Sequence, residues 1–146
     1  GRFGLGLVNA DGARMRWLKG PAEGEPAVLP GMDLMLPVLS LRALGRPLDE
    51  KSAHRPERVA EITGTALGST IDAATFARLM SHPEGSLRGR GEARVVPVLN
   101  MVEPEQVEAA ESIARHALAA SHAFDRVLLC RLRDPTAPWW QLVTRM

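Results

Sequence analysis

Two apolar segments separated by a helical pattern constrain the fold of this chain most. Residues 94–99 and 125–132 each contain consecutive apolar residues, and residues 104–117 between them carry apolar side chains at helical spacing. Strands that are apolar on both faces are typical of parallel sheets covered by helices. A helix between two such strands is the usual parallel crossover. The sequence therefore predicts an α/β fold, a mostly parallel sheet with flanking helices.

The other predicted strands are shorter and are interrupted by proline and glycine. Residues 5–9 are predicted to form a buried strand, and residues 140–144 a short last one. Residues 14–31 contain three prolines and three glycines, which indicates an ordered, extended loop. Residues 32–41 form a further apolar run, in which Pro37 favours an edge strand or an early strand end.

Two further helices have clear start and stop signals. Proline suits the first helical position, so Pro56 is predicted to begin a helix that Gly64 ends. Asp72 can cap a second helix over residues 73–81, because its carboxylate can accept a hydrogen bond from the first turn. A glycine-rich basic loop is predicted to follow over residues 81–91.

Length and composition exclude several classes of protein. The chain has 146 residues, the size of one domain, and we treat residues 1–146 as a single α/β domain. Its net charge of +1 argues against non-specific nucleic-acid binding, and no apolar run reaches the ~20 residues of a membrane span. The single cysteine, Cys130, lies in an apolar run and is expected to be a buried, inert thiol. One cysteine fits a reducing compartment, so we expect a cytoplasmic protein.

Polar residues follow two of the predicted strands and fill two of the loops. Ligands of open parallel sheets bind beyond the carboxyl ends of the strands, so we expect these residues to face one cleft. An Asp after an apolar strand can hold Mg²⁺ through water, and a neighbouring Gly lets the backbone approach a ligand. The candidates are Asn9, Asp11, Gly12, Asn100, Met101 and Glu103 at the strand ends, and His54, Arg55, Glu57, His82, Glu84 and Gly85 in the loops.

Each of these signals also has a simpler structural interpretation. Asp11-Gly12 alone is more often a turn, and His54 more often a solvated residue before a helix. His82 followed by Pro83 is typical of a helix end, and a lone Lys19 is usually exposed rather than bound to phosphate. The histidines and the cysteine lack the spacing of zinc ligands, and the chain contains no Gly-x-x-x-x-Gly-Lys-Ser/Thr phosphate loop.

Taken together, the order and spacing of several stretches resemble the YqeC-like family, proposed accessory proteins of selenium-dependent molybdenum hydroxylases. The family's fold is similar to that of P-loop NTPases. The resemblance implies that this chain is the C-terminal part of such a domain, and that a strand, a phosphate loop and a helix precede it. The stretches that carry the resemblance are NADGARMRWLKGPAEGEPAVLPGMDL, RALGRPL, HRPERVAEITG, HPEGSLRG and ARVVPVLNMVE.

The resemblance also suggests which residues form the site. The matching positions are Asp11 and Gly12 in a Glu-Ala-Asp-Gly strand end, Lys19, Glu25 and Pro26 in the following loop, His54 to Glu57 in His-Arg-Pro-Glu, His82 to Gly85 in His-Pro-Glu-Gly, and Asn100 in Asn-Lys-x-Asp. Three positions depart from the family pattern: Asn9 replaces Glu, Met101 replaces Lys and Glu103 replaces Asp. These changes are expected to weaken or alter recognition of a nucleotide base.

Two functions follow as expectations. The first is a nucleotide-binding accessory protein, using ATP or GTP with Mg²⁺, that assists maturation of a molybdenum hydroxylase. The hydroxylase or its maturation proteins would be partners and the molybdenum cofactor a client ligand. Asp11 would help to order Mg²⁺, and Asn100, Met101 and Glu103 would face the base; without a phosphate loop, turnover by this chain alone is not expected.

The second expected function is a non-catalytic module that binds a protein or a cofactor at a degenerate nucleotide site. Its contacts would come from the loops at residues 52–57 and 81–91. Arg88, Arg90 and Arg94 would meet an anionic group there.

Overall fold

The structure is a computed structural model of the chain and describes residues 6, 16–22, 24–25 and 30–145. The strand predicted over residues 5–9 lies outside this part of the chain, apart from Gly6. None of the helices in the described part is long and apolar enough to cross a membrane.

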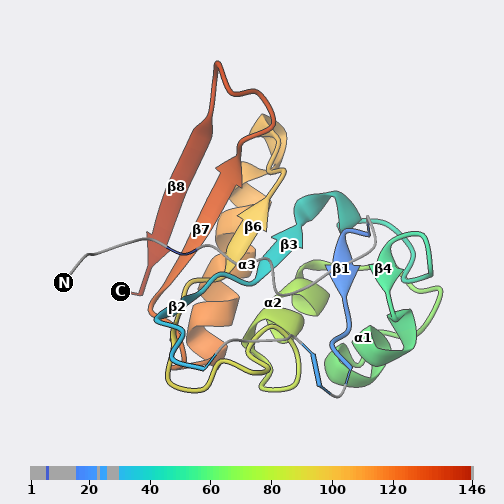
Figure 1. The fold of residues 1–146 in the computed structure, drawn as a ribbon. Coiled ribbons are helices and arrows are strands. Elements are labelled where there is room, and N and C mark those ends of the chain that lie inside the picture. The colour runs from blue at the N-terminus through green and yellow to red at the C-terminus, as the bar shows by residue number, and fades with distance from the viewer. Residues whose placement is uncertain (1–5, 7–15, 23, 26–29, 146) are drawn as a thin grey trace.

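The centre of the fold is a four-stranded sheet (Figure 1). Its strands lie in the order β3 (Val38–Ser40), β6 (Val98–Asn100), β7 (Arg126–Arg131) and β8 (Trp139–Thr144). The first three are parallel, and β8 pairs antiparallel with β7. The predicted α/β class with a mostly parallel sheet is therefore confirmed. The antiparallel last pair arises because β7 and β8 are joined directly by a short connection instead of a crossover helix.

A second strand pair continues this sheet beyond two prolines. β2 (Leu34–Met35) pairs in parallel with β5 (Arg94–Val95), and the partners differ by 60 in residue number, as they do between β3 and β6. Pro37 and Pro97 lie opposite each other between the two strand pairs. Neither proline has a backbone N–H to donate, but the carbonyl of each still accepts a hydrogen bond. β3 is the edge strand of the four-stranded sheet, as Pro37 predicted.

Two short strands lie beside β3. β1 (Leu18–Lys19) pairs in parallel with β4 (Ala53–His54), and the Ser40 N–H donates to the Trp17 carbonyl at 3.1 Å. The sequence predicted only an extended loop over residues 14–31 and gave no sign of β4. Both strands have two residues, too few for a periodic signal, and their pairing depends on residues far apart in the chain.

Three helices form where their start and stop signals lie. α1 (Pro56–Thr63) begins with proline and ends before Gly64, whose φ is 76°. α2 (Ala73–Ser81) is capped by Asp72, whose Oδ1 accepts from the Thr75 N–H at 2.9 Å. α3 (Val107–Ala120) follows the short 3-10 helix η2 (Pro104–Gln106), and a second one, η1 (Leu41–Ala43), follows β3.

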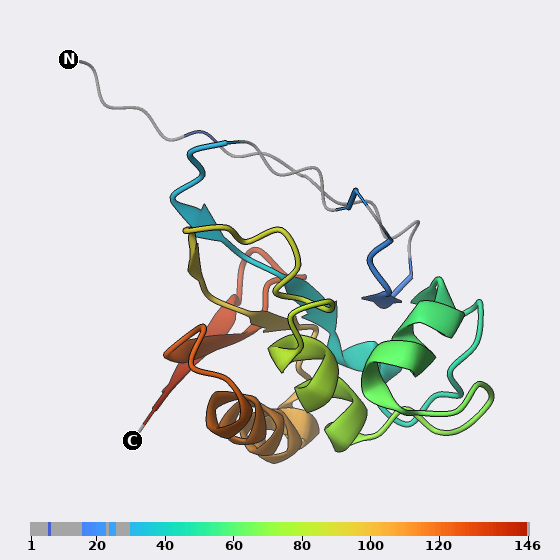
Figure 2. The ribbon, with the colours of Figure 1, turned by 90° about the horizontal axis from the view of Figure 1, so that it is seen from below.

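The core lies between the sheet and two of these helices. α2 and α3 pack against each other on one face of the sheet, as Figure 2 shows. Phe76 and Met80 of α2, Ile113 of α3, and Leu99 and Leu129 of the sheet are each fully buried. Burying a side chain of this size contributes about 1.5–3 kcal/mol, which explains why two short helices are stable here.

The opposite face of the sheet carries an apolar row that is exposed at both ends. Val38, Val98, Leu128 and Leu142 are cross-strand neighbours. Val98 is buried, whereas Val38 is 61% and Leu142 is 43% exposed. Both faces of the central strands are therefore apolar, as the sequence predicted, although helices α2 and α3 cover only one of them.

A substitution at Gly85 tests how closely the loop after α2 packs against that helix. A Cβ atom on Gly85 would lie 2.4 Å from the Leu79 carbonyl oxygen, which also accepts from the Ser86 N–H. We expect Gly85→Ala to lower the free energy of unfolding by about 1–3 kcal/mol, because overpacking forces the backbone apart. Urea denaturation measures this change. Gly6→Ala is the control, since no atom lies within 4 Å of its added Cβ; equal stability of both variants would contradict the close approach.

Candidate functional site

Six charged side chains from three segments form what we call the ion-pair cluster. Its members are Lys19, Glu25, Arg55, Arg58, Glu84 and Arg88. They come from β1 and the loop after it, from the N-cap and first turn of α1, and from the loop after α2. The sequence motifs that contain Lys19, Glu25, Arg55 and Glu84 are therefore brought together in space.

Glu25 is the centre of the first half of this cluster. Its carboxylate accepts from Arg55 Nη1 at 2.7 Å and Nη2 at 2.8 Å, and it lies 2.7 Å from Lys19 Nζ. The hydrogen bonds from Arg55, followed by that from Lys19, lower the pKa of Glu25 from 4.5 to about 2. Lys19 was expected to be exposed, but its side chain is only 10% accessible because it reaches this carboxylate.

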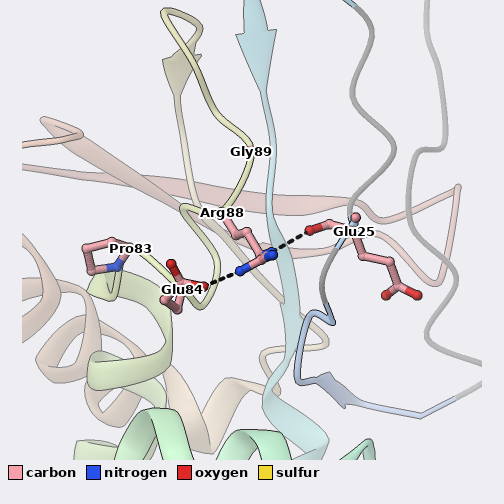
Figure 3. Close-up of a pocket in the computed structure, with 6 residues that line it drawn as sticks. Glu25, Pro83, Glu84, Arg88 and Gly89 are labelled. Atoms are coloured by element: carbon pink, nitrogen blue, oxygen red, sulfur yellow. Dashed lines mark hydrogen bonds and ion pairs between the residues drawn. The ribbon is translucent and has the colours of Figure 1, made fainter.

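Glu84 is the centre of the second half. Its Oε2 accepts from Arg58 Nη2 at 3.2 Å and also forms an ion pair with Arg88. Arg88 joins the two halves, because its Nε donates to the backbone carbonyl of Glu25 at 2.9 Å (Figure 3). The sequence missed Arg58; its position three residues after Arg55 on the predicted helix was the available signal.

The backbone around Arg55 explains how its side chain reaches Glu25. Arg55 has φ 57° and ψ 65°, a left-handed conformation directly before Pro56. Its neighbour His54 accepts at its backbone carbonyl from the Gly20 N–H at 2.9 Å. A Cβ atom on Gly20 would lie 2.6 Å from the Arg58 Cβ, so only glycine lets the loop approach α1 so closely.

A shallow cavity of about 420 Å³ opens beside the cluster. Its lining consists of Gly24, Glu25, Pro83, Glu84, Arg88 and Gly89 (Figure 3). Gly24 has φ 82° and Gly89 has φ 77°, so both turns use the conformational freedom of glycine. The cavity thus combines charged side chains with accessible backbone.

The remaining loop candidates surround the cluster without joining its ion pairs. Glu57 is exposed in the first turn of α1, and Arg90 is exposed at the end of the loop after α2. His82 Nδ1 accepts from the Glu84 N–H at 3.0 Å, which fixes the start of that loop. Gly85 is buried against α2.

The second candidate site lies at the carboxyl end of β6. Asn100 Oδ1 accepts from the Met101 N–H at 2.8 Å and from Cys130 Sγ at 3.4 Å. Met101 has a left-handed φ of 60°, and Glu103 follows at the N-terminal side of η2. The side chain of Asn100 therefore fixes the turn in which Met101 and Glu103 lie.

A second cavity of about 570 Å³ adjoins this turn, and we call it the strand-end cavity. Its lining consists of Met101, Glu103, Arg131, Arg133, Asp134, Pro135 and Ala137. Arg131 Nη1 donates to the Val102 carbonyl at 2.8 Å, and its guanidinium lies 5.4 Å from the centre of the Trp139 ring. The sequence offered no signal for Arg131 and Arg133, because their proximity to Met101 depends on the pairing of β6 with β7.

The two sites lie at opposite ends of the molecule. In Figure 1, the end of β6 and the start of α3 are at the top, and the start of α1 and the loop after α2 lie toward the bottom. The structure therefore does not bring the residues of the ion-pair cluster together with Asn100. Asn9, Asp11 and Gly12 lie outside the described residues.

Two simpler expectations can be compared with the described part of the chain. Cys130 is 1% exposed, and burial raises its pKa, as expected of an inert thiol. No group of three His, Cys, Asp or Glu side chains within the described ranges could hold a metal ion. The proposed Mg²⁺ ligand, Asp11, is not among those residues.

Comparison with known proteins supports the family resemblance for part of the chain. Residues 2–57 match the family model described as YqeC protein. This segment resembles YqeC. The chain is also 30% identical over 82 residues to the uncharacterized protein YqeC of Escherichia coli (strain K12), an alignment that covers 56% of this chain and 32% of that protein. No solved structure matches the chain.

The pH dependence of stability tests the ion pairs of Glu25. Because its pKa is lowered from 4.5 to about 2, the ionised carboxylate stabilises the fold above about pH 4.5, and this contribution is lost as the pH falls toward 2. We expect Glu25→Gln to flatten the pH dependence of the unfolding free energy in that window. Urea titrations between pH 6 and 2 measure it. Glu92→Gln is the control, since Glu92 is exposed; identical slopes for both variants would contradict the pairing.

Proposed function

We propose that this chain is part of a cytoplasmic, nucleotide-binding accessory protein that assists maturation of a selenium-dependent molybdenum hydroxylase. The observation that carries the proposal is the strand-end cavity, which lies where ligands of parallel sheets bind. The match of residues 2–57 to YqeC supports the family context. Since the chain spans 32% of the E. coli relative, the activity and partners of the whole protein belong to the proposal.

The strand-end cavity has the chemistry to bind a nucleotide base. The Glu103 carboxylate offers two acceptors, which suits the adjacent N–H donors of guanine better than the single amino group of adenine. The Met101 side chain is apolar and can pack over a ring. Arg131 and Arg133 add positive charge at the same cavity, which favours an anionic nucleotide.

Phosphate and metal binding belong to other parts of the proposed site. Asp11 would help to order Mg²⁺, and Asn9 and Gly12 would lie beside it. A phosphate loop would supply the backbone donors that the phosphates need. Within this chain the proposed role is therefore recognition of the base, with the hydrolysis of ATP or GTP left to the complete site.

Nucleotide selectivity tests this role. We expect the full-length protein to bind Mg²⁺-GTP more tightly than Mg²⁺-ATP, and Glu103→Gln to weaken GTP binding about ten- to a hundredfold, the usual effect of losing a hydrogen bond to a charged group. Isothermal titration calorimetry measures both affinities. Glu105→Gln is the matched control, because Glu105 is exposed in the same turn. Equal affinity for the two nucleotides, or equal effects of both variants, would refute the assignment.

A non-catalytic binding module is the second candidate, favoured by two exposed arginines. Arg90 ends the loop after α2 and Arg94 begins β5, and both are exposed to solvent. An anionic group on the molybdenum hydroxylase or on its cofactor would contact them without any turnover.

Binding to the hydroxylase tests this second candidate. We expect the double variant Arg90→Ala/Arg94→Ala to weaken binding of the cognate hydroxylase about fivefold or more at low salt, since rim charges act through screened attraction. Surface plasmon resonance with the purified hydroxylase measures the effect. Arg115→Ala on the exposed side of α3 is the control, and a loss no larger than that control's would exclude the loop from the interface.

A further inference from the structure

We propose that the ion-pair cluster is an anion-binding site for a phosphomonoester or diphosphate group, which takes the place of the Glu25 carboxylate between Lys19 and Arg55. Glu25 then acts as an internal stand-in that occupies the site while the ligand is absent. The inference is independent of nucleotide binding at the strand-end cavity.

The donors around Glu25 have the geometry that phosphate requires. Both Nη atoms of Arg55 contact one carboxylate, at 2.7 and 2.8 Å, in the two-pronged arrangement that also binds phosphate oxygens. Lys19 Nζ approaches the same group at 2.7 Å. A phosphate that replaces the carboxylate keeps these three contacts and has further oxygens for the neighbouring donors.

The charges of the cluster favour this replacement. Lys19, Arg55, Arg58 and Arg88 supply four positive charges, and the carboxylates that pair with them are Glu25, Glu61 and Glu84. Once the Glu25 side chain leaves, four cations face two carboxylates. The remaining excess of two positive charges matches a dianionic phosphate ester.

The position of Glu25 allows the exchange. Its side chain is 30% exposed, so the carboxylate can turn to solvent. Lys19 is only 10% exposed and stays in place, and Arg55, at 34% exposed, is open to an incoming anion. The cavity of about 420 Å³ lies directly beside it. The hydrogen bond from Arg88 Nε holds the backbone carbonyl of Glu25 and leaves its side chain able to turn.

The wild-type protein, two variants and two simple anions test the proposal. We expect the wild-type protein to bind pyrophosphate weakly at pH 7 and low salt, and Glu25→Gln to bind it about tenfold more tightly, because the competing carboxylate is gone. Adding Arg55→Lys to Glu25→Gln should weaken pyrophosphate binding about tenfold, since lysine keeps the charge but not the two-pronged contact. Isothermal titration calorimetry with pyrophosphate and with inorganic phosphate measures the affinities, and circular dichroism checks that each variant is folded.

Two further variants distinguish binding at this cluster from binding elsewhere and from attraction to net charge. The measured quantity is pyrophosphate binding at the cluster, so failure of the nucleotide assignment does not affect this test. Glu105→Gln changes an exposed residue outside both sites and should leave pyrophosphate binding unchanged. Glu92→Gln removes the same charge away from the cluster and should bind as the wild type does. Equal binding by Glu25→Gln and Glu92→Gln would show attraction to net charge only and would overturn the proposal. So would the absence of binding to folded Glu25→Gln, or an unchanged affinity on adding Arg55→Lys.

Discussion

The parallel ladder between residues 34–40 and 94–100 is the constraint on which the rest of the structure depends. The paired residues differ by 60 in residue number on both sides of Pro37 and Pro97. The two segments therefore form a single strand pair that the prolines interrupt. Residues 95 and 99 of this pair are buried on one face, and a slip of one residue would turn both toward the opposite face of the sheet, away from α2 and α3. The ladder also places Ser40 where it bonds Trp17 and so positions β1 and β4.

The same constraint separates the two candidate sites. β6 delivers Asn100 and Met101 to one end of the sheet, and β7 adds Arg131 there. β1 and β4 end instead toward the start of α1, where Arg58 of α1 and Arg88 of the loop after α2 donate to backbone carbonyls of the loop after β1. A single polar cleft was expected because ligands of parallel sheets bind beyond the carboxyl ends of the strands. The loops of the ion-pair cluster follow β1, β4 and α2 instead, and these elements are not part of the four-stranded sheet.

Local signals in the sequence predicted the helices and the strand break at Pro37. They could not predict pairing between segments that are far apart in the chain. Asp72, Gly64 and Pro56 act within one helical turn, so their effect can be derived from neighbouring residues. The burial of Lys19 depends on Glu25 and Arg55, and the latter is 36 residues away along the chain. The family motifs named most members of the cluster, but only the fold shows that they share ion pairs.

Backbone strain links both sites to function. Within the described ranges, Arg55 and Met101 are the two residues other than glycine with positive φ. Such conformations cost about 1–3 kcal/mol and persist only where surrounding contacts fix them. Glu25 binds the Arg55 side chain, and Asn100 binds the Met101 N–H. Strain of this kind clusters at sites that bind ligands. Met101 lines the strand-end cavity, and the Arg55 side chain pairs with Glu25, which lines the other cavity. The strain therefore lies beside both cavities and supports a binding role for each.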